Sequence, residues 1–240
     1  MDTISYVALT RQTGLLNELQ VVANNLANMS TTGFRAEGVV FAEMVEALPA
    51  EGGSIAMTEA RVRYTNALQG ALERTGGTLD LGIQGDGFFQ IETPDGNKLS
   101  RNGAFATNAE SELVTMDGYP VLDASGARIF VPPDAANISI ASDGTLSADG
   151  NAVAQVGLLT VDDFSSLTRS DGVMFVPDGP VRVAEGAVVM QGFLEQSNVN
   201  PVVEITRMIE VQRAYELGQR LLEKDDERIR TVVRTLGAAV

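Results

Sequence analysis

The sequence predicts an α+β protein, in which long N- and C-terminal α-helices pair as a coiled coil and flank a central, mainly antiparallel β domain of sandwich or barrel-like form. One observation predicts the helices: apolar residues recur at spacings of three and four near both chain ends. A second predicts the β domain, because Asp-Gly pairs recur between short runs in which apolar and polar residues alternate. The predicted segments are an N-terminal helical segment (1–35), a connector (36–78), the β domain (79–198) and a C-terminal helical segment (199–240).

The N-terminal helix is predicted over residues 3–29, about 40 Å at 1.5 Å per residue. Its apolar residues alternate at spacings of four and three, which is typical of a helix that packs against another helix. This predicted seam consists of Leu15, Leu19, Val22, Leu26 and Met29.

Three asparagines, Asn24, Asn25 and Asn28, lie in the last two turns of this helix. Each costs about 0.5 kcal/mol relative to Ala in a helix, so we expect their amides to hydrogen-bond outside it, to neighbouring chains. Ser30-Thr31-Thr32-Gly33 ends the helix, with Gly33 at positive φ, and Phe34 follows as an apolar anchor.

Residues 36–78 show little periodicity. Gly-Gly pairs at 52–53 and 76–77 interrupt them, and residues 41–48 are compatible with one or two helical turns. We therefore expect an extended, partly irregular connector.

The β domain is predicted from Leu79 onward. Asp-Gly pairs occur at 86–87, 95–96, 117–118, 143–144, 149–150, 171–172 and 178–179. Such pairs favour tight turns, because Gly adopts positive φ freely and Asp tolerates it. The runs between them are short and rich in β-branched and aromatic residues, which indicates many short strands.

The C-terminal helix is predicted from Pro201, with Asn200 as its N-cap, for roughly 36 residues or about 54 Å. Its apolar seam keeps the 3-4 spacing and consists of Met208, Val211, Tyr215, Gly218, Leu222, Ile229, Val232 and Leu236. Gly218 would let a partner backbone approach closely, and Asp225 within the seam would set the register. Glu216–Arg220 and Asp226–Arg230 are spaced as stabilising i,i+4 pairs.

Composition argues against catalysis. The 240 residues include no Cys, His or Trp, which excludes thiolate nucleophiles, disulfides and the commonest general base and metal ligand. Gly85-Asp86-Gly87 lacks the remainder of a phosphate loop, and Asp162-Asp163 and Asp225-Asp226 do not have the spacing of a calcium loop. We predict no catalytic, cofactor-binding or metal site.

Charge is unevenly distributed. The net charge is −15, and residues 38–200 hold 22 of the 32 acidic and 8 of the 17 basic residues. No basic stripe suitable for nucleic acid is present. No apolar run approaches the ~20 residues that cross a bilayer, and the N-terminus lacks the features of a cleaved signal peptide. Near-neutral chain ends are compatible with dense packing against copies of the same chain.

Four motifs in order resemble those of one family. They are Ala23-Asn24-Asn25-Leu26-Ala27-Asn28 with Thr32-Gly33-Phe34-Arg35, then Gly85-Asp86-Gly87-Phe88-Phe89-Gln90, Leu113-Val114-Thr115-Met116-Asp117-Gly118-Tyr119-Pro120, and Gly192-Phe193-Leu194-Glu195-Gln196-Ser197-Asn198-Val199-Asn200-Pro201. The chain resembles the bacterial flagellar rod and hook proteins. The opening Ile4-Ser5-Tyr6-Val7-Ala8-Leu9 is more similar to the proximal-rod members than to the distal-rod members.

This resemblance implies a structural subunit of the flagellar basal-body rod, which spans the periplasm. Such a subunit polymerises through its terminal helices into a helical tube that transmits motor torque for motility. The implied partners are proximal and distal rod proteins, copies of the same chain and the flagellar type III export apparatus, with no nucleic acid, no membrane insertion and no cleaved signal. The expected assembly interface consists of Leu15, Leu19, Val22, Asn24, Asn25, Leu26, Asn28, Met29, Thr32, Gly33, Phe34, Met208, Val211, Tyr215, Gly218, Leu222, Ile229 and Val232.

Three alternatives remain open from the residues alone. The first is a distal-rod or hook subunit of the same family. The second is a secreted β domain that binds a carbohydrate or a surface partner and uses its helices only as a stalk. The third is an enzyme that uses carboxylates alone, such as Asp162 and Asp163.

Overall fold

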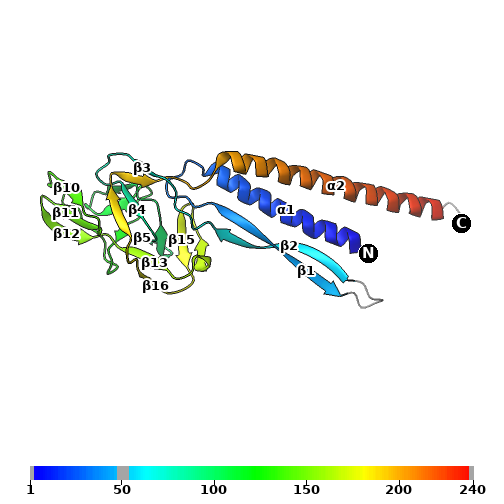
Figure 1. Cartoon of the computed structure of the whole chain (residues 1–240), viewed down its shortest axis with the longest axis horizontal. Coiled ribbons are helices and arrows are strands. Elements are labelled where there is room, and N and C mark those ends of the chain that lie inside the picture. Colours follow the sequence, from blue (N-terminus) through cyan, green and yellow to red (C-terminus); the bar gives the residue numbers. More distant parts are fainter. Residues whose placement is uncertain (1–2, 48–53, 238–240) are drawn as a thin grey trace. The chain divides into compact units, whose positions relative to one another are not determined.

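The computed structural model describes residues 3–47 and 54–237, and the chain divides into two compact units (Figure 1). Unit 1 contains the described residues of Met1–Ala27, Glu37–Tyr64 and Asn200–Val240. Unit 2 contains Asn28–Ala36 and Thr65–Val199. Both chain ends therefore belong to the same unit, while most strands belong to the other.

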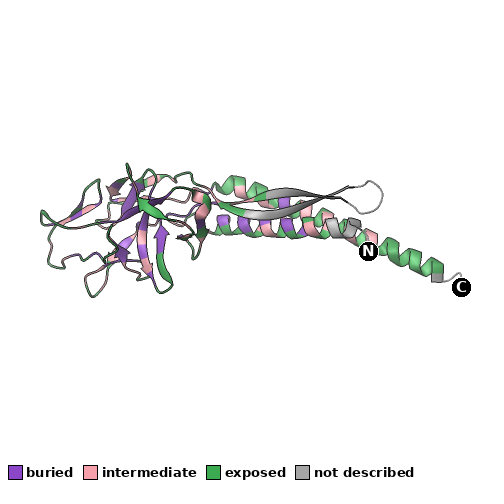
Figure 2. Cartoon of the chain, turned by 90° about the horizontal axis from the view of Figure 1, so that it is seen from below, coloured by how far each residue is buried: buried purple, intermediate pink, exposed green. Residues whose placement is uncertain are grey.

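Unit 1 is built around two long helices. Helix α1 spans Thr3–Ala27 and helix α2 spans Pro201–Gly237, and the two lie side by side in both views (Figures 1 and 2). They are antiparallel, because Gln12 contacts Tyr215 whereas Glu18, further along α1, contacts Arg207. The Asn200 side chain accepts hydrogen bonds from the backbone N–H groups of Val202 and Val203, at 3.1 and 3.3 Å, which confirms the predicted N-cap.

The connector is extended, as predicted, but it is largely regular where an irregular course was expected. Strand β1 spans Glu37–Ala47 and strand β2 spans Ser54–Thr65, and they form a two-stranded sheet whose β1 lies against α1. The alternative of helical turns over 41–48 is wrong for residues 41–47, and the Gly52-Gly53 pair lies outside the described residues. Both strands are rich in Val, Ile, Tyr, Thr and Phe, residues that favour extended backbone. Charged residues within both strands interrupt the apolar runs, so the sequence does not show the alternation of apolar and polar residues that is typical of a strand.

Unit 2 holds the predicted antiparallel β domain, with a curled sheet. Its strands are β3 (Leu72–Arg74), β4 (Leu81–Gln84), β5 (Phe88–Thr93), β6 (Gly96–Ser100), β7 (Phe105–Thr107), β8 (Leu113–Thr115), β9 (Val121–Leu122), β10 (Ile138–Ile140), β11 (Thr145–Ala148), β12 (Asn151–Gln155), β13 (Leu158–Val161), β14 (Leu167–Arg169), β15 (Met174–Pro177), β16 (Val181–Val183), β17 (Val188–Gln191) and β18 (Phe193–Glu195). The largest sheet has the order β14-β15-β6-β5-β13-β16, and β9 also pairs with β5.

One Asp-Gly pair illustrates how the turns set strand register. Asp149 and Gly150 connect β11 to β12 with φ of 51° and 83°, and Ala148 pairs with Asn151 across them. Two consecutive residues at positive φ define the tight hairpin turn that matches the twist of the strands. The sequence prediction of an Asp-Gly hairpin is confirmed here.

The core of unit 2 consists mainly of two clusters of buried apolar side chains, and Phe34, Ala36 and Val199 form a third, minor one. The larger includes Phe89, which packs edge-on against Phe105 with ring centroids 5.0 Å apart. The smaller surrounds Phe88, which packs edge-on against Phe175 at 5.9 Å. Because Phe88 and Phe89 are adjacent in β5, their side chains point to opposite faces of the sheet, and each face has its own core.

Candidate assembly interface

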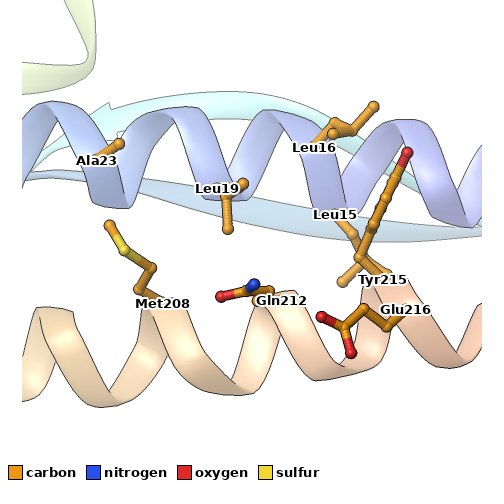
Figure 3. Close-up of a pocket in the computed structure, with 8 residues that line it drawn as sticks. All are labelled: Leu15, Leu16, Leu19, Ala23, Met208, Gln212, Tyr215 and Glu216. Atoms are coloured by element: carbon orange, nitrogen blue, oxygen red, sulfur yellow. The ribbon is translucent and has the colours of Figure 1, made fainter.

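The two helices of unit 1 enclose an apolar groove with a volume of about 540 Å³ (Figure 3). Helix α1 contributes Leu15, Leu16, Leu19 and Ala23 to its walls, and helix α2 contributes Met208, Gln212, Tyr215 and Glu216. Only one of these side chains, Glu216, carries a charge. Four of the expected seam residues therefore leave space between the helices instead of closing it.

Polar contacts set the register of the two helices. The Arg207 guanidinium donates to Oε1 of Glu18 at 2.5 Å, and Gln12 Nε2 donates to the carbonyl oxygen of Tyr215 at 3.0 Å. Both Glu18 and Gln12 are buried. Burial alone would lower the pKa of Arg207, but the hydrogen bond and the charge of Glu18 outweigh it, so the net pKa is raised. The buried carboxylate of Glu18 requires a partner, and the exposed Arg207 supplies it.

Gly218 allows a close approach, but from the chain's own α1. A Cβ atom at Gly218 would lie 2.1 Å from Nε2 of Gln12. The missing side chain thus leaves room for Gln12 to reach the α2 backbone. This explains a glycine in the middle of a long helix, where it costs about 1 kcal/mol relative to Ala.

The C-terminal part of α2 has no partner helix among the described residues. The contacts of Gln12 with Tyr215 and of Glu18 with Arg207 place the start of α1 opposite about residue 223. Beyond that point α2 continues to Gly237, and its end is exposed (Figure 2). The predicted seam residues Ile229 and Val232 are accordingly 41% and 50% exposed. Their predicted pairing with the N-terminal helix is wrong, because α1 is 25 residues long and α2 is 37.

The three asparagines have different environments. Asn25 is buried, and its side chain donates to the carbonyl oxygen of Glu37 at 2.8 Å and accepts from the Glu37 N–H at 2.9 Å. The Asn25 amide thus forms with the backbone of Glu37 the two hydrogen bonds that a peptide group of a neighbouring strand would form, and it joins α1 to the start of β1. Asn24 is exposed, and Asn28 is half-buried with its Oδ1 accepting from the Thr31 hydroxyl. The expectation that Asn25 bonds a neighbouring chain is therefore replaced by a bond within its own chain.

The residues after α1 are anchored inside unit 2. Gly33 has a φ of 71°, as predicted, and its N–H donates to the carbonyl oxygen of Glu195 at 2.7 Å. Phe34 is 1% exposed and packs with Val199. The central carbon of the Arg169 guanidinium lies over its ring, 4.4 Å from the ring centroid. Gly33 and Phe34 are therefore covered by their own chain, which makes any part they play in assembly indirect.

A buried ion cluster lies next to this anchor. Glu195 is 1% exposed and contacts Arg35 and Arg101, each at 3.1 Å. Arg101 also donates to the carbonyl oxygen of Gly85 at 2.8 Å. Burial lowers the pKa of Arg101 to about 10, even though the charge of Glu195 acts in the opposite direction. Burial also lowers the pKa of Arg35. Two cations share one buried carboxylate, so the cluster depends on Glu195.

Asn198 completes the connection between the segments of unit 2. Its Oδ1 accepts from the N–H of Ala36 at 2.6 Å, and its Nδ2 donates to the carbonyl oxygen of Leu68 at 2.7 Å. The segment that follows α1, the one that follows β2 and the one that precedes α2 are thus bound to one another. These are the segments at which the chain passes between unit 2 and unit 1.

The remaining predicted residues divide by burial. Val22 and Val211 are buried, Leu26, Thr32 and Leu222 are half-buried, and Met29 is 45% exposed. Sequence reasoning missed Gln12, Glu18, Arg101 and Glu195. The only available signal was the position of Glu195 within the Gly192–Pro201 motif.

In residues 3–47 and 54–237, no group of three acidic, His or Cys side chains has the arrangement of a metal site. Within the same residues, neither helix carries a stretch long and apolar enough to span a membrane.

Three family models match the chain. Residues 6–35 match the flagella basal body rod protein model, and residues 82–148 match the flagellar hook protein FlgE/F/G D1 domain. Residues 190–235 match the flagellar basal body rod FlgEFG protein C-terminal model. The matched ranges include the groove, Arg35, Arg101 and Glu195.

Relatives are similar over their full length. The chain is 39% identical to the flagellar basal-body rod protein FlgF of Caulobacter vibrioides over 247 residues, which cover 99% of each chain. It is 37% identical to FlgF of Mesorhizobium japonicum over 241 residues, again 99% of each. It is 36% identical to the flagellar basal-body rod protein FlgG of Agrobacterium fabrum over 264 residues, covering 96% of this chain and 98% of the relative.

Proposed function

The chain belongs to the family of flagellar basal-body rod proteins, structural subunits of the flagellum, and we propose that it is a proximal-rod subunit that polymerises through α1 and α2. The observation that carries this proposal is the exposed apolar surface of α2. Val202, Val203, Leu217, Leu221 and Val233 are each between 56% and 73% exposed. Leu217 and Leu221 lie one helical turn apart on the same face. Monomeric soluble proteins rarely expose neighbouring large apolar side chains over a sizeable area, and such surfaces mark interaction sites.

Burial of this surface would supply the free energy of assembly. Each Val, Leu or Ile side chain that leaves water contributes about 1.5–3 kcal/mol. The apolar residues lie along the whole length of α2, so contacts between copies need not use the same patch on both sides. Head-to-tail contacts that do not close a ring generate a helical tube, the form required of a rod. In that tube α1 and α2 would pack with coiled-coil spacing, and unit 2 would face other rod subunits or solvent.

The remaining parts of the proposal follow from the rod assignment. The rod crosses the periplasm, so the chain would be exported by the flagellar type III apparatus without a cleaved signal peptide. It would transmit motor torque through its packed helices, without membrane insertion and without catalytic activity. The composition supports this proposal, because the chain lacks the His and Cys side chains on which most catalytic sites depend.

The test is a pair of matched double variants in a strain that lacks the native gene. Val232→Ser with Val233→Ser removes two exposed valines from α2. Val181→Ser with Val183→Ser removes two exposed valines from β16 of unit 2 and serves as the control. We expect the α2 variant to be missing from purified basal bodies and the cells to be non-motile, while the control assembles. Normal incorporation of the α2 variant would contradict assembly through the helices.

A distal-rod position is the second candidate, favoured by the 36% identity to a FlgG protein over nearly the full chain. Complementation separates the two. Restored motility in a strain that lacks its proximal-rod FlgF protein, without restoration in one that lacks FlgG, supports the proximal position. The reverse result would assign the distal rod.

A further inference from the structure

The last turns of α2 form an apolar surface with arginines at its edge, which we name the overhang and define as residues 226–236. Ile229, Val232, Val233 and Leu236 follow the spacing i, i+3, i+4, i+7 and therefore lie on one face of the helix. They are 41%, 50%, 65% and 67% exposed, respectively. No described residue of α1 lies opposite them, so this face has no partner helix within residues 3–47 and 54–237.

Arginines border the apolar face of the overhang. Arg228 and Arg230 pair with Asp225 and Asp226 at 2.7 and 2.8 Å. Arg230 and Arg234 lie one turn apart, next to Val233 on the helix surface. Arg234 forms no ion pair within the described part of the chain. The overhang thus presents apolar side chains with an available guanidinium at their edge.

The groove between α1 and α2 has the complementary properties. Leu15, Leu19 and Met208 make its walls apolar, and its volume of about 540 Å³ lies open between two helices (Figure 3). Its one charged lining residue is Glu216, which is exposed. The predicted ion pair of Glu216 with Arg220 does not form, and Glu216 has no ionic partner among the residues that the structure describes. An apolar groove with an unpaired carboxylate at its edge suits a helix with apolar and basic residues.

We propose that the groove between α1 and α2 binds the overhang of a second copy of this chain, with Val233 and its apolar neighbours in the groove and Arg234 paired with Glu216. This inference deepens the proposed rod assembly and rests on it. Each copy then offers one groove and one overhang, which are different surfaces. Such a contact is heterologous, so it repeats from copy to copy instead of closing a symmetric dimer.

The same contact cannot form within one chain. The helix register places Leu16, in the groove and close to the level of Glu216, opposite about residue 210 of its own α2. Val233 lies 23 residues further along, or about 35 Å at 1.5 Å per residue. A disulfide requires Cα atoms within about 7 Å. A disulfide between positions 16 and 233 therefore reports a contact between copies.

Cysteine cross-linking tests the proposal directly, because the chain contains no native cysteine. The test variant carries Leu16→Cys and Val233→Cys, both at exposed positions. The control carries Leu16→Cys and Thr231→Cys, since Thr231 is exposed in the same overhang but on the opposite face from Val233. Basal bodies are purified from cells that express each variant, oxidised, and analysed on non-reducing gels.

We expect the test variant to form a ladder of covalent multimers and the control to remain largely monomeric. Basal bodies that contain the test variant without a ladder would overturn the docking and leave the rod assignment intact. Equal ladders from both variants would also overturn it, because cross-linking would then be independent of the face. Absence of the unmodified chain from basal bodies would instead overturn the rod assignment.

A charge exchange provides a second test that needs no cysteines. Glu216→Arg and Arg234→Glu each place like charges at the proposed contact, and we expect each to lower incorporation into basal bodies several-fold. The double variant restores opposite charges and should restore incorporation. A double variant as poor as the worse single variant would overturn the pairing. Attachment of the full chain to anionic phospholipid vesicles through Val232 and Val233, without a ladder in basal bodies, would assign the overhang to a lipid surface and overturn the proposal.

Discussion

Glu195 balances two buried arginines, Arg35 and Arg101, and this balance makes it the most sensitive single residue of unit 2. Replacement of the pairs by apolar groups would not be costly in principle, because a buried ion pair loses much of its hydration. Removal of the carboxylate alone is different, since it leaves two buried guanidinium groups with only the more exposed carboxylate of Asp86 acting on them. The cost arises from the partners that remain.

We expect Glu195→Gln to lower the free energy of unfolding by about 3–5 kcal/mol, the range for breaking a buried pair. Chemical denaturation followed by far-UV circular dichroism measures this change. Glu185→Gln is the control, because Glu185 is an exposed carboxylate of the same unit. A change of less than about 1 kcal/mol in the Glu195 variant would mean that the arginines find other partners.

The exposed carboxylate of Asp143 makes a contribution to stability that depends on pH. Its two oxygens accept from the backbone N–H and the hydroxyl of Thr145, each at 2.9 Å. The backbone hydrogen bond, followed by that of the hydroxyl, lowers the pKa of Asp143 below its ordinary value of 3.8. Because the folded-state pKa is lowered, the contribution is present above pH 3.8 and is lost as the pH falls through the folded value.

We expect Asp143→Asn to flatten the acid side of the stability profile while it changes stability at neutral pH only slightly, because the amide oxygen still accepts from Thr145. The measurement is the free energy of unfolding between about pH 6 and pH 2. Asp134→Asn, at an exposed carboxylate without a hydrogen bond in the described chain, should leave the profile unchanged. Identical profiles for the native chain and the Asp143 variant would refute this account.

At the scale of elements, the pairing of α1 with α2 depends on the space beside Gly218. Gln12 fills that space and bonds the carbonyl oxygen of Tyr215. The side chain of Gln12 has rotatable bonds, so a methyl group at Gly218 would displace only its end. A larger side chain would push against α1 itself. The two substitutions should therefore differ in their effects.

We expect Gly218→Leu to destabilise the helix pair by about 1–3 kcal/mol, as overpacking does. Gly218→Ala should be nearly neutral, since the gain in helix propensity offsets the lost hydrogen bond. Thermal loss of helical circular dichroism measures both. Addition of Gln12→Ala should rescue the Leu variant by making room. Without that rescue, the crowding would involve some side chain other than Gln12.

At the scale of the whole molecule, the two units differ in how they are stabilised. The apolar clusters of unit 2 are made of buried side chains. Unit 1 leaves many apolar side chains of α2 exposed, so its helices gain less from burial in a single chain. Isolated helices are marginal in water, and most helical stability comes from packing.

We therefore expect hydrogen exchange to distinguish the units in the unassembled chain. Backbone amides of residues 8–27 and 201–236 should exchange faster than those of β5, β6 and β13 in unit 2. Mass spectrometry of deuterated peptides measures the rates, and the assembled rod provides the comparison in which the helices become protected. Equal protection of the helices and the β core in the monomer would contradict this difference.

The sequence by itself determined the elements that depend on local pattern. The 3-4 spacing predicted both helices, Asn200-Pro201 predicted the start of α2, and Asp149-Gly150 predicted a hairpin. These predictions hold because caps, turns and helix faces depend on residues within a few positions of one another. The order of the motifs also identified the family.

Only the tertiary structure decided which residues meet. The pairing of Glu195 with Arg35 and Arg101, of Asn25 with Glu37, and the groove beside Met208 each involve partners that no local spacing specifies. Helix α2 extends beyond the start of α1 and leaves Ile229 and Val232 exposed, and where it does so depends on the register in which the two helices pack. Burial is a property of the folded chain, and a single repeating pattern is compatible with a closed seam, an open groove or an unpaired end.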